Sequence, residues 1–342
     1  MLRTLRWRAL PMALALGVGA LAASLPCRDV AAGPLRDRLA ERRAERQAQK
    51  EARETRGVDG IEDDEGAAMA ALPAGVRVVR DVSYGSDPQQ RFDVYSNGLA
   101  KGAPVIFMVH GGGWRLGSKS AKSVVEHKVA RWVPKGFVFV SVGYRLLPQA
   151  DPVEQARDVA RALAAAQEQA ANWGGDRSRF ILMGHSAGAH LVALLTTTPA
   201  LAAGVEHPPQ PWLGTVALDS AVFNVVEIME HRHLRLYDNA FGSDHEYWKS
   251  ASPFFSVTKA SRPILAVCSS RREDSCRQAH QFATKAAALG VTTTVLEKDF
   301  SHRDINQRLG EEPRYTGEVE AFLGRLDKGA AQLLAGPPRD SR

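Results

Sequence analysis

The chain of 342 residues lacks the cysteine spacing of a metal site and the long apolar run of a membrane-spanning helix. Its three cysteines match no zinc-binding spacing. Its longest apolar run, residues 9–23, is interrupted by Pro11 and falls short of the roughly 20 apolar residues that a membrane-spanning helix needs. No internal repeat is present. We therefore expect no metal, no stable membrane span after removal of the N-terminus, and no repeat architecture.

The chain also lacks an excess of charge outside its N-terminus. Residues 1–57 hold 12 Lys or Arg against 6 Asp or Glu, an excess equal to the +6 of the whole chain. The remainder is formally neutral, which removes the support for nucleic-acid binding. With 44% hydrophobic residues, the chain can form one large α/β domain with a sizeable core.

The N-terminus has the pattern of a secretory signal peptide. Three arginines within the first eight residues precede the apolar run 9–23, and small residues follow it. Cleavage after Ala22 or Ala23, or after Ala32, fits this pattern. Pro26 stands where a lipoprotein would have a small residue before its cysteine, which argues against lipidation. We predict a signal peptide over 1–32 and an exported protein, periplasmic or secreted.

Composition divides the rest of the chain into three parts. Residues 33–73 are rich in Arg, Glu, Ala and Gln and have few apolar residues, so they predict a solvated helical or disordered spacer. Residues 74–327 alternate strand-like and helix-like segments and form the predicted catalytic domain. Residues 328–342 are expected to be a flexible C-terminal tail.

The segment 184–188, with the sequence Gly-His-Ser-Ala-Gly, indicates a serine nucleophile. It follows the apolar strand 180–183 and precedes the apolar helix 189–196. A sharp strand-to-helix turn exposes the Ser hydroxyl, and flanking glycines remove side chains that would collide across the turn. Ser186 is therefore the predicted nucleophile.

A glycine-rich motif follows the buried strand 104–109. His110 is followed by three glycines and Trp114, an arrangement that lets backbone N–H groups approach a reacting carbonyl oxygen. A phosphate-binding loop would require a Lys-Ser/Thr ending or dinucleotide glycine spacing, and the motif has neither. We predict oxyanion donors at Gly111, Gly112 and Ala187, and a bracing role for His110.

These two motifs resemble those of α/β-hydrolase esterases and lipases, the group of hormone-sensitive lipase and bacterial carboxylesterases. The segments 143–146 and 251–253 are similar to the same family. The lipases proper have Asp before the nucleophile, whereas His185 stands here, which resembles the bacterial esterase and arylformamidase branches more. The resemblance implies an α/β-hydrolase fold: a mostly parallel central sheet, helices on both faces, and a small cap-like insertion, here at 223–262.

The fold family orders its triad as nucleophile, acid and base along the chain. Asp274 lies in the loop after the strand 263–267, and His302 follows the last predicted strand, 292–296. We assign Asp274 as the acid and His302 as the base. Two alternatives for the acid remain: Glu273, which is adjacent to Asp274, and Asp219, at the end of the preceding strand.

Two further assignments concern the surroundings of the triad. Trp114 and Phe223 adjoin strand ends near Ser186 and are expected to wall the substrate pocket. In an oxidising compartment, Cys268 and Cys276 can form a disulfide across the loop of the predicted acid.

Together these features predict a serine carboxylic-ester hydrolase that acts on small or medium acyl esters without a cofactor. Its expected partner is a small-molecule ester rather than a nucleic acid. Two alternatives remain. One is an arylformamidase-like or other amide hydrolase on the same fold, and the other is a non-catalytic hydrolase-like binding protein.

Overall fold

The computed structural model describes residue 42, which is helical, and residues 72–336. The predicted signal peptide (1–32) and almost all of the predicted spacer (33–73) lie outside the described residues.

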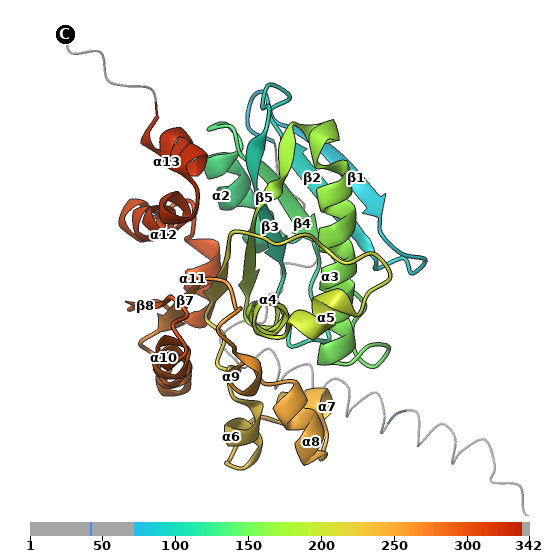
Figure 1. Ribbon diagram of the computed structural model, residues 1–342, viewed down its shortest axis with the longest axis vertical. Coiled ribbons are helices and arrows are strands. Elements are labelled where there is room, and N and C mark those ends of the chain that lie inside the picture. The colour runs from blue at the N-terminus through green and yellow to red at the C-terminus, as the bar shows by residue number, and fades with distance from the viewer. Residues whose placement is uncertain (1–41, 43–71, 337–342) are drawn as a thin grey trace, which may run out of the picture. The chain divides into compact units, whose positions relative to one another are not determined.

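An eight-stranded sheet organises this part of the chain (Figure 1). Its order is β1-β2-β4-β3-β5-β6-β7-β8; β2 pairs antiparallel with β1 and β4, and the other pairs are parallel. The strands are β1 (Arg77–Ser83), β2 (Arg91–Ser96), β3 (Ala103–Val109), β4 (Val138–Val142), β5 (Gly175–His185), β6 (Gly214–Leu218), β7 (Ile264–Ser269) and β8 (Thr293–Lys298). This mostly parallel sheet with covering helices confirms the predicted α/β-hydrolase fold.

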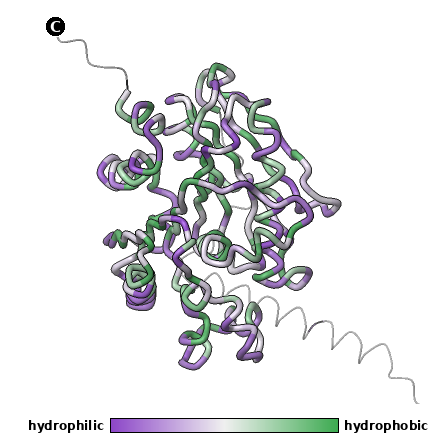
Figure 2. Tube along the Cα trace, viewed as in Figure 1, coloured by the Kyte–Doolittle hydropathy of each residue, from purple (hydrophilic) through white to green (hydrophobic). Residues whose placement is uncertain are grey.

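Side-chain alternation along the central strands supplies two apolar faces. In β3, Val105 and Phe107 belong to one buried cluster, whereas Ile106 and Met108 belong to the other. Burial on both faces explains why these strands are continuous apolar runs rather than alternating ones. Figure 2 shows hydrophobic residues concentrated along the central strands.

Helices cover both faces. One face packs against α3 (Pro152–Gln169), α4 (Ala187–Thr197) and α10 (Glu273–Ala288), and the other packs against α2 (Lys122–Trp132), α11 (His302–Gln307) and α12 (Pro313–Leu326). Shorter elements are η1 (Ala170–Trp173) and α5 (Pro199–Ala203). Among the described residues, no helix combines the length and the apolar character needed to cross a membrane.

The cap-like insertion contains four short helices. They are α6 (Val225–Met229), α7 (Arg235–Phe241), α8 (His245–Ser250) and α9 (Pro253–Ser256), and they lie together at the bottom of Figure 1. The insertion separates β6 from β7, which are neighbours in the sheet. It therefore stands beside the carboxyl ends of the strands, where open α/β sheets bind ligands.

The prediction of a flexible tail from residue 328 is wrong for most of its described part. Residues Lys328–Ala335 form α13. The Asp327 side chain caps the helix by accepting a hydrogen bond from the Ala330 N–H at 2.6 Å. Ala330 is buried in the core, and Leu333 and Leu334 pack against it. The apolar face of α13 therefore holds this segment against the core.

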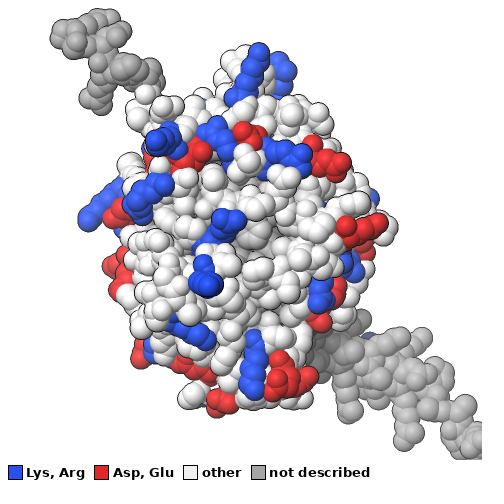
Figure 3. Space-filling model, in the orientation of Figure 1, with Lys and Arg blue, Asp and Glu red and all other residues white. Residues whose placement is uncertain are grey.

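Charge is mixed on the visible surface. On the face shown in Figure 3, Lys and Arg lie among Asp and Glu around the rim.

Candidate active site

Ser186 lies on a strained turn between β5 and α4. Its backbone has φ 54° and ψ −117°, a left-handed conformation that side chains other than glycine rarely adopt. A Cβ on Gly184 would lie 2.3 Å from the Gly188 carbonyl oxygen, and one on Gly188 would lie 2.3 Å from that of Val109. The two glycines of the motif are therefore needed for the close approach that exposes Ser186.

The glycine-rich loop turns sharply beside this serine. Gly112 and Gly113 have positive φ, and Trp114 follows at φ 61°. A Cβ on Gly111 would lie 3.1 Å from the Ser186 Cβ, so the loop packs directly on the nucleophile. Among the loop residues, Gly113 and Trp114 line the pocket together with Ser186 and Ala187. Gly111 and Gly112 are not among the lining residues, and their role as oxyanion donors stays a prediction.

The base and its acid come together from the ends of β8 and β6. His302 Nδ1 lies 2.5 Å from Asp219 Oδ2, and both side chains are buried. His302, Ser186 and Asp219 line one pocket. Asp274 instead lies in the first turn of α10, half exposed, with its Oδ2 3.4 Å from Arg272 Nη2. The assignment of Asp274 as the acid is therefore wrong, and Asp219, one of the two alternatives, takes its place beside His302.

Four donors surround the Asp219 carboxylate. Oδ1 accepts the backbone N–H of Ser269 at 2.8 Å and the hydroxyl of Ser275 at 2.5 Å. Oδ2 accepts from His302 Nδ1 and from Arg272 Nη1, the latter at 3.0 Å. Burial alone would raise the pKa of Asp219, but the hydrogen bond and charge of His302, the charge of Arg272 and the Ser275 hydroxyl outweigh it and lower the pKa below its ordinary value. Asp219 is thus an ionised partner for His302.

The pocket around Ser186 has aromatic and aliphatic walls. Trp114, Leu236 and Tyr237 line it, the last two from the cap helix α7. It holds about 340 Å³ of space not filled by protein atoms, part of it open to solvent. Only about 20 Å³ of this space would hold the centre of a water-sized sphere, so the enclosed part of the pocket is narrow, which favours a small substrate group. Burial raises the pKa of Tyr237 to about 12, so its hydroxyl stays protonated at neutral pH.

The second predicted wall residue lies elsewhere. Phe223 is buried in the core against Phe282 of α10, with ring centroids 4.7 Å apart and nearly parallel rings. It is not among the residues that line the pocket. The assignment of Phe223 as a pocket wall is wrong because its side chain turns toward α10.

His190, on α4, links the glycine-rich loop to the cap. Its Nδ1 accepts a hydrogen bond from Trp114 Nε1 at 3.2 Å, and its Nε2 lies 2.7 Å from the Ala251 carbonyl oxygen. Burial lowers the pKa of His190 to about 4, so the ring is neutral and can accept at one nitrogen while donating at the other.

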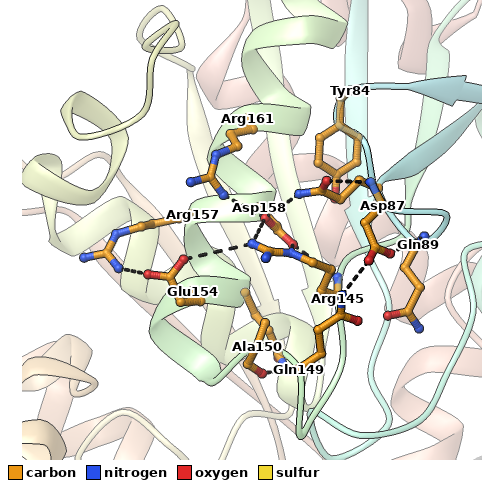
Figure 4. Close-up of polar contacts among 12 residues, drawn as sticks. Tyr84, Asp87, Gln89, Arg145, Gln149, Ala150, Glu154, Arg157, Asp158 and Arg161 are labelled. Carbon is orange, nitrogen blue, oxygen red and sulfur yellow. Dashed lines mark hydrogen bonds and ion pairs between the residues drawn. The ribbon is translucent and has the colours of Figure 1, made fainter.

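The buried carboxylate of Asp158 supports the glycine-rich loop through a neighbouring segment. Asp158 of α3 accepts from Arg145 Nε and Nη2, each at 2.7 Å, and from Arg161 Nη1 at 2.8 Å (Figure 4). These bonds fix the loop after β4, whose Leu147 N–H donates to the Trp114 carbonyl oxygen at 2.9 Å. The network therefore holds Trp114 in place from outside the pocket.

Three other predicted residues occupy supporting positions. The His110 ring is buried and stacks on Tyr144, and the Tyr144 hydroxyl donates to the His110 carbonyl oxygen at 2.9 Å. Cys268 and Cys276 are paired, with their sulfurs 2.07 Å apart. No cluster of three or more His, Cys, Asp or Glu that could hold a metal ion occurs in the described part of the chain.

Comparison with known proteins places this geometry in context. The pattern of the BD-FAE family matches residues 92–285. The isoprenylcysteine alpha-carbonyl methylesterase ICME of Arabidopsis thaliana is 28% identical over 291 residues, 77% of this chain and 66% of that protein. Kynurenine formamidase of Danio rerio is 31% identical over 171 residues, 48% of this chain and 55% of that protein.

A solved structure shares the fold. Esterase B from Lactobacillus rhamnosis superimposes with a TM-score of 0.64 at 20% identity, covering 86% of this chain and 95% of that chain. The chain spans about half the length of several of the curated relatives it matches.

Proposed function

The chain belongs to the BD-FAE family of α/β-hydrolases, and we propose that it is a serine hydrolase of carboxylic esters. One observation carries the proposal. Ser186, a serine on a strained turn, lines the same pocket as the buried pair His302 and Asp219. These are the nucleophile, base and orienting acid that acyl transfer requires.

The proposed reaction has two steps. Ser186 Oγ attacks the ester carbonyl carbon while its proton passes to His302 Nε2, and Asp219 stabilises the resulting imidazolium. The carbon–oxygen bond to the alcohol then breaks, and His302 returns the proton to the departing oxygen. In the second step a water molecule, deprotonated by His302, attacks the acyl-enzyme and releases the acid and Ser186.

Negative charge on the carbonyl oxygen needs donors that are in place before the reaction. We propose the backbone N–H groups of the glycine-rich loop and of Ala187, with Gly113 joining the predicted Gly111 and Gly112 because Gly113 lines the pocket. Each such donor contributes about 3 kcal/mol to transition-state stabilisation. The reaction as written needs no cofactor.

The substrate proposal follows from the pocket walls. Trp114 lies 5.0 Å from Phe241 and 6.0 Å from Tyr237 between ring centroids, so aromatic rings close one side of the space beside Ser186. We therefore expect small or medium acyl groups. An amide or formamide hydrolase is the second candidate, supported by the similarity to kynurenine formamidase.

Hydrolysis of p-nitrophenyl acetate, butyrate and octanoate by the full chain tests this proposal. We expect kcat/KM to be highest for acetate or butyrate and to fall by at least about tenfold for octanoate, because the longer chain exceeds the narrow space beside Ser186. An aryl formamide measured in parallel separates the two candidates. Turnover of the formamide alone would favour the amide hydrolase, and no turnover of any substrate would refute both.

We also propose that the protein is exported and that the Cys268–Cys276 disulfide forms after export. The support is the signal-like pattern of the first 32 residues and a disulfide that an oxidising compartment would preserve. Sequencing the N-terminus of the protein recovered from the periplasm or medium should show cleavage near Ala23 or Ala32. A full-length protein with two reduced thiols in the cytoplasm would contradict export.

A further inference from the structure

The segment that the sequence predicted to supply the catalytic acid instead surrounds Asp219, an acid from the end of another strand. Residues 269–275, between the paired Cys268 and Cys276, supply three of the four donors to Asp219. Two of them, the Ser269 N–H and the Ser275 hydroxyl, hold Oδ1. The third, from Arg272, is the only one of the three that reaches Oδ2, the oxygen that faces His302.

Arg272 occupies an unusual position for an arginine. Its side chain is only 13% exposed and lines the pocket that contains Ser186. Nη1 lies 3.0 Å from Asp219 Oδ2 and 2.8 Å from His302 Nδ1. Because the Nδ1 proton points to Oδ2 at 2.5 Å, Nη1 cannot donate to Nδ1 as well. Both donors therefore converge on one carboxylate oxygen.

Charge argues against a role in binding an anionic substrate. Arg272 already contacts two carboxylates, Asp219 through Nη1 and Asp274 through Nη2. A substrate carboxylate brought to this guanidinium would meet both negative charges at short range. The guanidinium is thus committed to the protein rather than to a ligand.

We propose that Arg272 is a positioning residue, which fixes the Asp219 carboxylate so that Oδ2 faces His302 Nδ1 and thereby orients His302 toward Ser186. The proposal rests on the esterase activity proposed above. Its physical basis is that, without Arg272, the donor left on Oδ2 is His302, the group that has to be oriented, so the carboxylate and the imidazole could turn together about Oδ1. A misplacement of about 1 Å in a catalytic group can cost on the order of 100-fold in rate. Asp274 then has a definite place as the outer partner of Arg272.

The neighbouring arginine provides a matched control. Arg271 is about half exposed, and its Nε lies 2.7 Å from Asp299 Oδ1 on the surface. Arg272→Ala should lower kcat on p-nitrophenyl acetate by about 10- to 100-fold and leave KM within about threefold. Arg271→Ala should leave both unchanged. Added guanidinium ion should restore part of the kcat of Arg272→Ala, whereas sodium chloride at the same ionic strength should not.

Arg272→Lys covers the case in which Arg272→Ala does not fold. It keeps the positive charge on a single donor nitrogen but loses the planar fork of the guanidinium. We therefore expect its kcat to lie between those of wild type and Arg272→Ala and its KM to be unchanged, whereas the control Arg271→Lys should match wild type in both. A rise in KM at constant kcat would overturn the proposal in favour of substrate binding. Equal kcat in the Arg272 variants and wild type, or a folded Arg272→Ala that guanidinium does not restore, would also overturn it.

A spectroscopic measurement separates this proposal from the proposed function. The proton shared by His302 Nδ1 and Asp219 should give a low-field proton resonance, identified by its loss in Asp219→Asn. Arg272→Ala should shift or broaden that resonance and Arg271→Ala should not, whether or not any ester is hydrolysed. An unaffected resonance would overturn the positioning role, whereas inactivity of wild type on all esters and the formamide would refute the hydrolase activity alone.

Discussion

Replacing Asp219 with asparagine should lower kcat by about 10⁴-fold, while the fold is kept. Asp219 Oδ2 accepts the His302 Nδ1 proton at 2.5 Å, and an amide nitrogen in its place would favour the opposite tautomer of the ring. Nε2 would then carry the proton and could not accept the one from Ser186. Steady-state kinetics on p-nitrophenyl acetate measures the loss, and circular dichroism checks the fold.

Asp274→Asn is the matched comparison. Asp274 contacts Arg272 at 3.4 Å, is half exposed and does not touch His302, so its replacement should change kcat by less than about tenfold. If Asp274→Asn lost as much activity as Asp219→Asn is expected to lose, the acid would come from the loop after β7 and the arrangement described here would be incorrect.

Replacing Ser186 with alanine should reduce kcat by about 10³-fold or more, because no hydroxyl remains to form the acyl-enzyme. The remaining turnover would come from water held against the oxyanion donors. The measurement is kcat on the same ester, with active protein verified by its unfolding curve. A Ser186→Ala variant that retained more than about a tenth of the activity would exclude Ser186 as the nucleophile.

Ser186→Gly adds a second readout at the same position. Ser186 has φ 54°, a conformation that glycine adopts without strain. This variant should be as inactive as Ser186→Ala but more resistant to urea, by about 1 kcal/mol in the free energy of unfolding. Lower stability than that of Ser186→Ala would show that the turn stores no strain.

The strand-to-helix turn at Ser186 and the glycine-rich loop could be predicted because the residues that they require lie close together in the sequence. Gly184 and Gly188 are needed where backbones meet within a few residues of Ser186, and the buried strands before both motifs are plain apolar runs. The alternating strands and helices then allow few topologies. For the same reason the disulfide partners, eight positions apart, could be proposed from the sequence.

The acid could not be predicted because its choice depends on two neighbouring strand ends. β6 and β7 lie side by side, and a carboxylate follows each of them, at Asp219 and Asp274. Side-chain direction decides which one reaches His302, and the sequence does not show that direction; in the structure Asp219 contacts His302, whereas Asp274 contacts only Arg272 among these residues. Arg272, two positions before Asp274, is the sequence feature that could have indicated an ion pair for Asp274 in place of a contact with His302. Phe223 was misplaced for a similar reason, because its contact with Phe282 joins segments far apart in the chain.

Covalent labelling shows whether Ser186 is the activated nucleophile of this protein. The full chain would be treated with a p-nitrophenyl alkylphosphonate, which transfers its phosphonyl group to an activated serine and releases p-nitrophenol, and then analysed by intact mass and peptide mapping. We expect one adduct per chain, on Ser186, formed in step with the loss of esterase activity and absent from Ser186→Ala. A protein that hydrolyses esters while remaining unlabelled, or that is labelled at another residue, would contradict this expectation.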